Sequence, residues 1–494
     1  MASDLMLRAG KAAGWVVVSR WFDLIGSLVT LAITARLLPP ETFGIFGMAM
    51  LACLIPELVL SGALGDGVIQ RKDLRPGHLN GVFWLHVVLF LVFMAGLFLM
   101  TPLFAAQFDQ PMLTDIIPVM ALSIVFWVLS VVPGALLRRE LRFGALCVAD
   151  ALSTAAAFIV GVGMALMGFG VWSLVWQEIA RRCVKWIAMS ISARWAPSVT
   201  FTRADVTDLL RFNVLGLATR IIYELETAIP KYFIGLFLGA QMLGYFNMAV
   251  RFYQQLTQVL LSPFTSVALP VIASIQHDRE QLHATFAAGT KAATMLAFPA
   301  FIGAAAVAPV AIPLIFGETW IPAIPAAQIM IIAAVRAPVN AFNGELMRGT
   351  GHPGIYTTLV GLGAIMMAVM VPLVTSFGIA AVSLTILVRG IVQWAVAAYV
   401  VQRTVGYPAI KQFTIGWQSF IAAAGMGIVV ALALPWLEFL PRPVSLGLLG
   451  LLGVVVHMAL LSILAPQLAK RLLSFFVALA RRDKKSLTRI LGLT

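Results

Sequence analysis

The chain has 494 residues, of which 61% are hydrophobic and only 11% are charged, and its mean hydropathy is +0.96. A soluble globular protein carries roughly 25% charged residues, so this composition excludes a soluble globular protein and indicates a polytopic membrane protein. The formal net charge is +13, which we attribute to membrane topology and an anionic lipid surface; we expect no nucleic-acid partner.

Apolar runs long enough to cross a bilayer recur along the chain. A hydrocarbon core of about 30 Å needs about 20 apolar residues per helix, and this rule predicts about fourteen transmembrane helices. The runs are unbroken and do not alternate, which disfavours the strands of a barrel. The predicted fold is therefore an all-α integral membrane protein, with helices centred near residues 26, 52, 90, 126, 156, 182, 223, 258, 300, 335, 364, 390, 425 and 455.

Alternate loops between these helices are basic, and the opposite loops nearly lack Lys and Arg. Basic loops stay in the cytoplasm, so both termini are predicted to be cytoplasmic. The basic loops include Arg71 to Arg75, Arg138 to Arg142, a cluster from Arg181 to Arg211, and Arg403 with Lys411. The opposite loops are too short for the extramembrane region of a glycosyltransferase. With no Walker, HExxH or Cys/His motif either, we expect no enzyme activity, no catalytic residue, no metal ion and no cofactor.

The sequence repeats itself after about 200 residues. The stretch LLPPETFGIFGMAM shares five residues with FLGAQMLGYFNMAV, namely Leu38, Gly44, Phe46, Met48 and Ala49, found again 200 positions later. A second block repeats at an offset of 208, where Phe169-Gly170 returns as Phe377-Gly378. Because six helices fit this spacing and six is even, the pattern predicts two parallel six-helix repeats plus two C-terminal helices.

The predicted boundaries follow from this repeat. We expect an N-terminal six-helix lobe over residues 1–200, a C-terminal six-helix lobe over 201–405, two additional transmembrane helices over 406–466, and a basic amphipathic cytoplasmic tail over 467–494. The tail has apolar residues at helical spacing and a basic polar face, which is typical of a helix lying on the inner leaflet. A docking helix for cytoplasmic glycosyltransferases is the alternative.

Polar side chains step along one face of the first, seventh and eighth predicted helices. Charge at the bilayer centre is costly unless it is paired or hydrated, so such stripes indicate a substrate pathway. Intrahelical pairs that only stabilise the bundle, such as Arg20–Asp23 and Arg220–Glu224, are the alternative. The candidate pathway residues are Arg20, Asp23, Arg220, Tyr223, Glu224, Thr227, Lys231, Asn247, Arg251, Gln254 and Gln258. Arginine suits bidentate phosphate contacts, and the amides and hydroxyls suit sugar hydroxyls.

The run TARLLPPETFGIFGMAMLACLIPELVLSGALGDGVIQRKDL, from Thr34 to Leu74, resembles the first-to-second-helix signature of the polysaccharide transporter family. These are Wzx-type flippases of the multidrug/oligosaccharidyl-lipid/polysaccharide exporter superfamily. The runs LLRRELRF and GFGVWSLV resemble that family as well. The resemblance covers nearly the whole chain and implies two six-helix bundles around a central cavity. The family's recurrent cavity arginines match here only loosely, at Arg20, Arg220 and Arg251.

The resemblance implies a flippase for undecaprenyl-pyrophosphate-linked oligosaccharide, working by alternating access of two lobes in exopolysaccharide or lipopolysaccharide export. Its expected partners are the lipid-linked oligosaccharide, membrane lipids, and polysaccharide polymerase and export machinery. Two alternatives lie in the same superfamily: a lipid II flippase, which differs in glycan selectivity, and a multidrug exporter, which favours acidic, aromatic cavities. The third is a non-transporting scaffold subunit of a polysaccharide synthase complex. For a scaffold, alanine at Arg20 or Arg220 would lower the amount of folded protein instead of activity.

Overall fold

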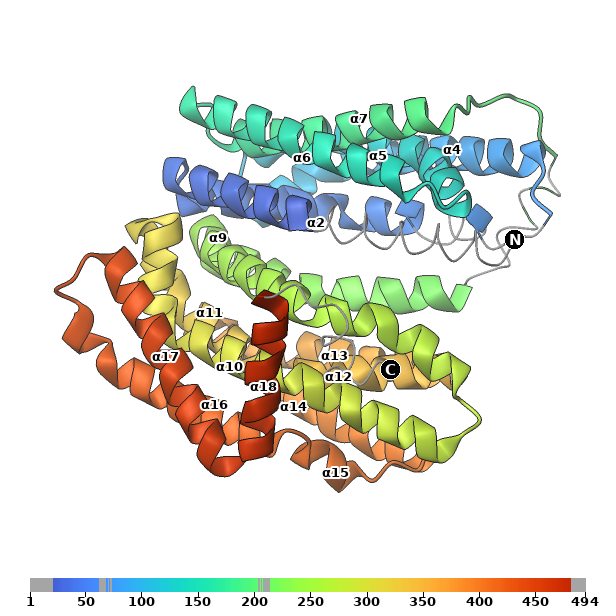
Figure 1. The fold of residues 1–494 in the computed structure, drawn as a ribbon. Helices are drawn as coiled ribbons and strands as arrows, with labels where there is room; N and C mark the ends of the chain where they lie inside the picture. The colour runs from blue at the N-terminus through green and yellow to red at the C-terminus, as the bar shows by residue number, and fades with distance from the viewer. Residues whose placement is uncertain are drawn as a thin grey trace. The chain divides into compact units, whose positions relative to one another are not determined.

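The computed structural model describes residues 21–61, 68–69, 71, 73–202, 205, 207 and 214–480. Every regular element in this part of the chain is a helix (Figure 1). Each predicted helix centre lies in helical residues, and residue 335 falls in a short 3-10 turn inside a longer helical segment. Among the described residues, 11 segments are long and apolar enough to cross a membrane, and one of them, Leu217–Ser274, holds both the seventh and eighth predicted helices. The all-α membrane fold is thereby confirmed.

The chain folds as two compact units, residues 1–247 and 248–494. The predicted lobe boundary at residue 200 rests on the sequence repeat, not on packing, and it stays a prediction. Unit 1 begins with a helix described from residue 21 to 37. It continues with α2 (Pro40–Ser61), α4 (Pro76–Gln107), α5 (Leu113–Arg139), α6 (Phe143–Leu166), α7 (Val171–Ala193) and the first part of α9 (Val214–Ser274).

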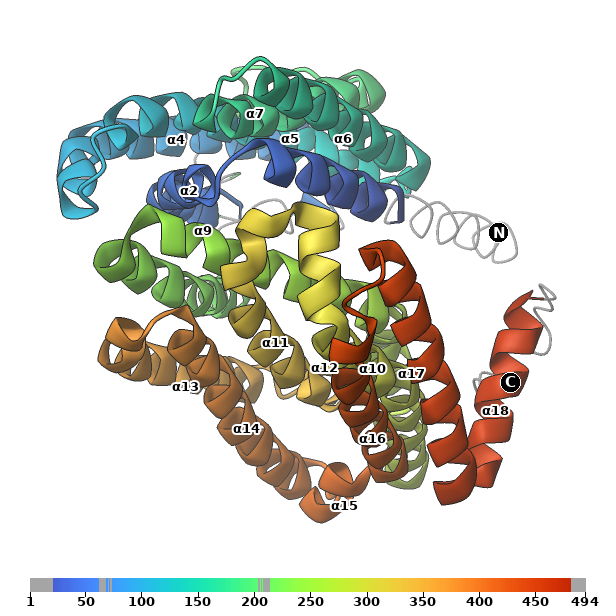
Figure 2. The same ribbon diagram turned by 90° about the vertical axis from the view of Figure 1, so that its left-hand side faces the viewer.

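Helix α5 forms the centre of unit 1. It packs against α2, α4 and α7, and α6 lies along α7 (Figures 1 and 2). Its side chains Ile116, Ile117, Met120 and Ile124 have no more than 1% of their surface exposed. Burying a side chain of this size contributes roughly 1.5–3 kcal/mol, so α5 holds the other helices of unit 1 together.

The basic cluster predicted to start at Arg181 begins later than the sequence indicates. Helix α7 continues to Ala193, so Arg181, Arg182 and Lys185 lie inside a helix and not in a loop. The physical reason is charge compensation: Lys185 lies 2.7 Å from Asp150 of α6, and Arg182 has two carboxylate partners. Paired in this way, basic residues are tolerated within a membrane helix.

The segment after α7 docks on the start of α4. Asn80 donates to the Ser198 hydroxyl over 2.7 Å and accepts from the Ser198 N–H over 3.1 Å. Asp205 accepts from the Thr202 N–H and hydroxyl over 2.9 and 2.7 Å and lies 3.4 Å from His78 Nε2. His78 is fully buried in the first turn of α4. This segment is therefore fastened to unit 1.

Unit 2 is built around α10 (Arg279–Phe316), which contacts α11, α12, α16 and α17 (Figure 2). Pro299, Pro309 and Pro313 lie inside α10, yet it stays one helix of 38 residues. Membrane helices tolerate proline where neighbouring helices satisfy the freed backbone groups. The other main elements are α11 (Ile324–Ala333), η2 (Ala334–Arg336), α12 (Ala337–Gly349), α13 (Pro353–Val374), α14 (Ile379–Thr404), α15 (Ala409–Thr414), α16 (Trp417–Ala433), α17 (Arg442–Leu464) and α18 (Pro466–Ala480).

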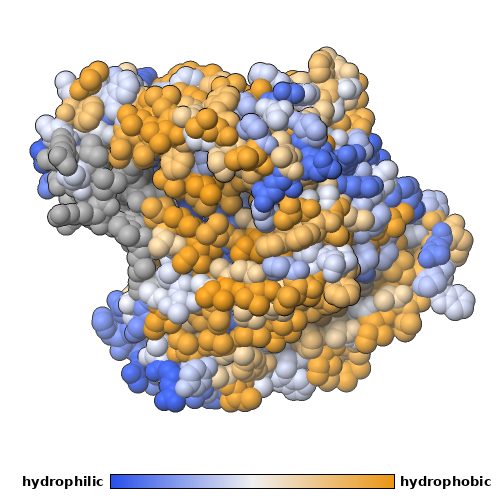
Figure 3. All heavy atoms as spheres, turned by 180° about the vertical axis from the view of Figure 1, so that it is seen from behind, coloured by the Kyte–Doolittle hydropathy of each residue, from blue (hydrophilic) through white to orange (hydrophobic). Residues whose placement is uncertain are grey.

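Helix α18 covers the first part of the predicted tail, and residues 481–494 lie outside the described part; the cytoplasmic location of the tail stays a prediction. Leu468, Ala469 and Leu472 are buried with Ala422 of α16 and Leu461 of α17, so one face of α18 packs on unit 2. Apolar side chains cover much of the face drawn in Figure 3. Leu432, Ile463 and Leu451 are each more than 60% exposed. Exposed apolar side chains of this kind are expected where a helix faces the lipid of a membrane.

Candidate functional site

The repeated sequence stretches pack against each other within unit 1. A Cβ added to Gly44 of α2 would overlap the backbone of Ala240, and a Cβ added to Gly244 of α9 would overlap the backbone of Pro40. Gly44 and Gly244 are equivalent in the repeat, and so are Pro40 and Ala240. A reciprocal contact of this kind is what a two-fold relation between two copies produces. We call these residues the glycine crossing.

The same relation holds one turn further along. Gly47 lies against the Asn247 side chain, and residues 47 and 247 are again equivalent in the repeat. Each α2-like helix begins after a break: α2 starts at Pro40 after non-helical residues 38 and 39, while α9 is interrupted at Gly239, whose φ is 80°. Small residues let membrane helices approach closely, so the glycines explain how α2 and α9 can cross backbone to backbone.

A buried charge cluster lies deeper in unit 1. Arg182 of α7 lies 2.7 Å from Glu57 of α2 and 2.5 Å from Glu178, one turn earlier on α7. Its guanidinium also lies 5.8 Å from the Trp127 ring of α5. Glu224 of α9 is near enough to act on Glu57 electrostatically. Two carboxylates thus contact one guanidinium, and Glu57, Glu178 and Arg182, which we call the acidic triad, join α2 to α7.

The predicted pathway residues of unit 1 do not gather at one point. Asp23 accepts from the Thr154 hydroxyl of α6 over 2.6 Å, and Thr227 donates to the Glu224 backbone carbonyl over 2.9 Å. Arg220 is exposed and Tyr223 is 50% exposed. No ion pair joins Arg220 to Glu224 among the described residues, and the role of Arg220 stays a prediction. Lys231 is half-buried, and Arg20 lies outside the described residues.

The remaining candidates lie further along α9. Asn247 sits at the glycine crossing against Gly47. In unit 2, Arg251 is half-buried, while Gln254 and Gln258 are exposed one turn apart on one face of the helix. Their assignment as pathway residues stays a prediction.

An intramembrane arginine stands out in unit 2. Arg336 ends the 3-10 turn η2 between α11 and α12, in the middle of an apolar segment from Glu318 to Gly349. Its guanidinium packs over Gly390 of α14, where any Cβ would overlap it, and Tyr253 of α9 lies near enough to interact with its charge. Its Nε is buried without a hydrogen-bond partner, and Arg336 has no ion pair in the described residues.

Amide groups follow Arg336 along α12. Asn340 and Asn343 lie one and two turns later on the same face, and their side chains include buried polar atoms without hydrogen-bond partners. Buried polar groups are normally satisfied, so this row of a cation and two amides is suited to an anionic, hydrogen-bonding ligand.

The predicted pathway residues do not include Glu57, Glu178 or Arg336, and Arg182 was predicted to lie in a cluster of basic loop residues. Two signals point to them: charged residues interrupting apolar helices, and the four-residue spacing of Glu178 and Arg182. Within the described residues, no group of three or more His, Cys, Asp or Glu side chains is placed to hold a metal ion.

The helical fold defines a multi-pass membrane protein, and charged residues buried within its membrane helices are typical of transporters. The solved lipid II flippase MurJ, in an inward closed conformation, matches with a TM-score of 0.76 over 92% of this chain and 99% of MurJ, at 14% identity. An inward-facing multidrug MATE transporter of the MOP superfamily matches with a TM-score of 0.64 over 79% of this chain and 96% of that one, at 15% identity. The chain thus shares the fold of these two solved transporters.

Residues 33–325, more than half of the chain, match the family described as polysaccharide biosynthesis protein. The chain belongs to this family. It is 26% identical to the succinoglycan biosynthesis transport protein ExoT of Rhizobium meliloti over 96% of both chains. It is 25% identical to the lipopolysaccharide biosynthesis protein WzxC of Escherichia coli over 68% of this chain and 69% of that one. The family predicted from the first-to-second-helix signature is confirmed.

Proposed function

We propose that this protein is a flippase that moves undecaprenyl-pyrophosphate-linked oligosaccharide units across the bacterial inner membrane for exopolysaccharide or lipopolysaccharide export. The family, the transporter fold and the names of its relatives support this proposal. The family is one of membrane transporters, so the protein works by moving a substrate and not by catalysis.

The observation that carries the proposal is the unpaired guanidinium of Arg336. A charge inside an apolar segment is expensive and is retained where it meets a partner. No carboxylate pairs with Arg336 in the described part of unit 2, and the face that follows it carries Asn340 and Asn343. A pyrophosphate with an attached sugar supplies both the negative charge for Arg336 and the hydroxyls for these amides. Arg20, Arg220 and Arg251 act on the same substrate in this proposal.

The glycine crossing suggests how the pathway is closed on one side. With a cytoplasmic N-terminus, the first helix runs outward and α2 begins at the outer surface. Gly44 and Gly244 then hold the outer ends of α2 and α9 together. Opening outward requires these two helix ends to separate, and the lobes rock about the breaks at Pro39-Pro40 and Gly239.

Substrate charge separates this proposal from its rivals. A multidrug exporter for cations has no use for an unpaired arginine, while a lipid II flippase shares the pyrophosphate and differs in the glycan. A scaffold subunit needs Arg336 only for folding.

The test replaces Arg336 by Gln and by Lys in cells that depend on this protein, with exposed Arg138 replaced by Gln as the matched control. We expect R336Q to reach the membrane in normal amount, to lose polymer export and to accumulate lipid-linked oligosaccharide. R336K retains part of the export, and R138Q is normal. Normal export by R336Q contradicts the assignment, and loss of both R336Q and R336K protein from the membrane supports the scaffold.

A further inference from the structure

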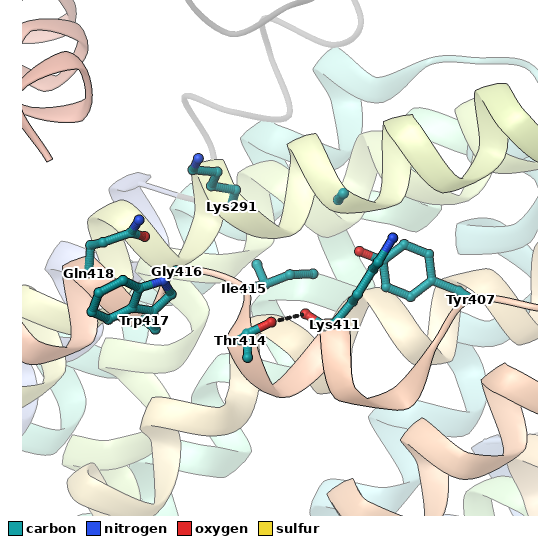
Figure 4. Close-up of a pocket in the computed structure, with 9 residues that line it drawn as sticks. Lys291, Tyr407, Lys411, Thr414, Ile415, Gly416, Trp417 and Gln418 are labelled. Atoms are coloured by element: carbon teal, nitrogen blue, oxygen red, sulfur yellow. Dashed lines mark hydrogen bonds between the residues drawn. The ribbon is translucent and has the colours of Figure 1, made fainter.

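A polar pocket of about 330 Å³ lies in unit 2, where the turn between α15 and α16 meets α10 (Figure 4). It lies apart from Arg336 and contains none of the predicted pathway residues. The lining residues are Ala287, Lys291, Tyr407, Lys411, Thr414, Ile415, Gly416, Trp417 and Gln418.

Two amino groups define the charge of this pocket. Lys291 comes from α10 and Lys411 from α15, and both line the pocket (Figure 4). Both are exposed, and neither forms an ion pair with a carboxylate in the part of the chain that the structure describes. The pocket therefore holds two positive charges without compensation, which favours an anion.

The turn is held in place by a close approach to α10. Gly416 lies against Thr294, and a Cβ at residue 416 would come within 3.0 Å of the Thr294 Cβ. Helix α16 starts directly afterwards, and its first return hydrogen bond runs from the Phe420 N–H to the Gly416 carbonyl over 2.9 Å. The N–H groups of Trp417 and Gln418 precede this bond, and both residues line the pocket together with the two lysines. Such groups add to the attraction of an anion.

Tyr407 completes the polar lining. Its ring is 6% exposed and packs edge-on against His283 and Phe286. Burial raises the pKa of Tyr407 above its ordinary value, so the phenol stays protonated and can donate a hydrogen bond.

The surroundings of the pocket identify the membrane surface as the source of the anion. The pocket lies at the end of the membrane-spanning segment Ala409–Ala433. Trp417 is 47% exposed there, as indole rings are at the level of lipid headgroups. Ile410, Phe413 and Phe420 beside it are 40% to 70% exposed, which provides an apolar surface for acyl chains.

We propose that Lys291, Lys411 and the N-terminal turn of α16 bind the phosphate of an anionic phospholipid headgroup. Basic pockets between membrane helices bind such headgroups through the same charge pairing. This inference rests on membrane insertion alone, so it stands or falls independently of the transported substrate.

The experiment uses the full chain purified in detergent and follows the thermal unfolding midpoint during titration with phosphatidylglycerol, phosphatidylcholine or inorganic phosphate. The variants are K291Q/K411Q, K291R/K411R and the matched control K470Q, which removes an exposed lysine of α18 outside the pocket. The concentration of phosphatidylglycerol that gives half the midpoint shift measures affinity.

For the wild type we expect a shift with phosphatidylglycerol that neither phosphatidylcholine nor inorganic phosphate reproduces. K291Q/K411Q should weaken the response roughly tenfold or more, at about 1 kcal/mol per basic residue near a lipid surface. K291R/K411R and K470Q should respond like the wild type. An unchanged response in K291Q/K411Q, or an equal response to phosphatidylcholine, overturns the proposal; an equal response to inorganic phosphate assigns the pocket to a soluble anion instead. Should the double variant not fold, the single variants K291Q and K411Q decide, since both side chains are exposed.

Discussion

Gly44 and Gly244, which lie 200 residues apart, each contact the residue that begins the other's helix: Gly44 lies on Ala240, and Gly244 lies on Pro40. This reciprocity explains why the sequence repeats itself there. Two copies of one helix-break-helix element meet across a two-fold relation, and the residues that must be small in one copy must be small in the other. The repeat is therefore a packing requirement as well as a trace of duplication.

Gly44→Ala should destabilise the protein by about 1–3 kcal/mol, because the added methyl group has no space against the Ala240 backbone. Thermal unfolding in detergent measures the change. Gly96→Ala on α4 is the matched control, since a Cβ there meets no atom within 4 Å. Equal unfolding midpoints for the two variants would show that α2 and α9 do not pack closely in solution.

The acidic triad gives a second stability prediction. Arg182→Gln removes the cation between Glu57 and Glu178 and should cost about 3–5 kcal/mol, the range for breaking a buried ion pair by deleting one partner. A triple variant with Gln at residues 57 and 178 and Met at 182 should recover much of this loss. Lys185→Gln, which breaks a more exposed pair with Asp150, should have a smaller effect. A larger effect of Lys185→Gln than of Arg182→Gln would contradict this ranking.

Gly390→Ala tests whether the position of Arg336 matters for transport. The new methyl group overlaps the guanidinium at the flexible end of the Arg336 side chain and should displace it. The protein should therefore fold while export falls roughly tenfold, equivalent to about 1.4 kcal/mol. Gly361→Ala on α13, where a Cβ meets no atom within 4 Å, should export normally. The measurement is polymer export divided by the amount of the protein in the membrane. Equal values for Gly390→Ala and Gly361→Ala would contradict the assignment of Arg336 to the substrate pathway.

The environment of Asp205 should make the stability of the segment docked on α4 depend on pH. Hydrogen bonds from Thr202 and the nearby His78 and Arg75 hold the pKa of Asp205 below its ordinary value. A depressed carboxyl pKa stabilises the fold above the unfolded value near 3.8 and loses this contribution as the pH falls through the folded value. The unfolding midpoint of Asp205→Asn should therefore lie below that of the wild type at pH 7 and converge with it under strong acid. A constant difference over the whole range would exclude this linkage.

Apolar length carried most of the fold prediction. A membrane-spanning helix can be recognised in the sequence as a run of about 20 apolar residues, and even α10, which contains three prolines, follows that rule. The assignment of basic residues to loops fails at α7, although a helix was predicted near residue 182. Arg182 and Lys185 look like loop residues until their acidic partners on other helices are known. Partners distant in sequence leave no local pattern.

The candidate site was less predictable for the same reason. Stripes on one helix can be read from spacing, which identified Asp23, Glu224 and Arg251 as polar-face residues. The sequence does not reveal that Gly390 opposes Arg336, or that Asn247 meets Gly47, because these contacts depend on how helices pack. Lys291 and Lys411 were assigned only to topology, although they share one pocket.

The most direct test of the flippase proposal is the leaflet occupied by the lipid-linked oligosaccharide. Spheroplasts from cells with and without this protein, both lacking the polymerase, are exposed to an impermeant glycan-binding probe that labels only the outer leaflet. We predict strong labelling with the wild-type protein, and loss of labelling at normal or raised total intermediate when the protein is absent or carries Arg336→Gln. Equal outer-leaflet labelling with and without the protein would contradict its role as the flippase.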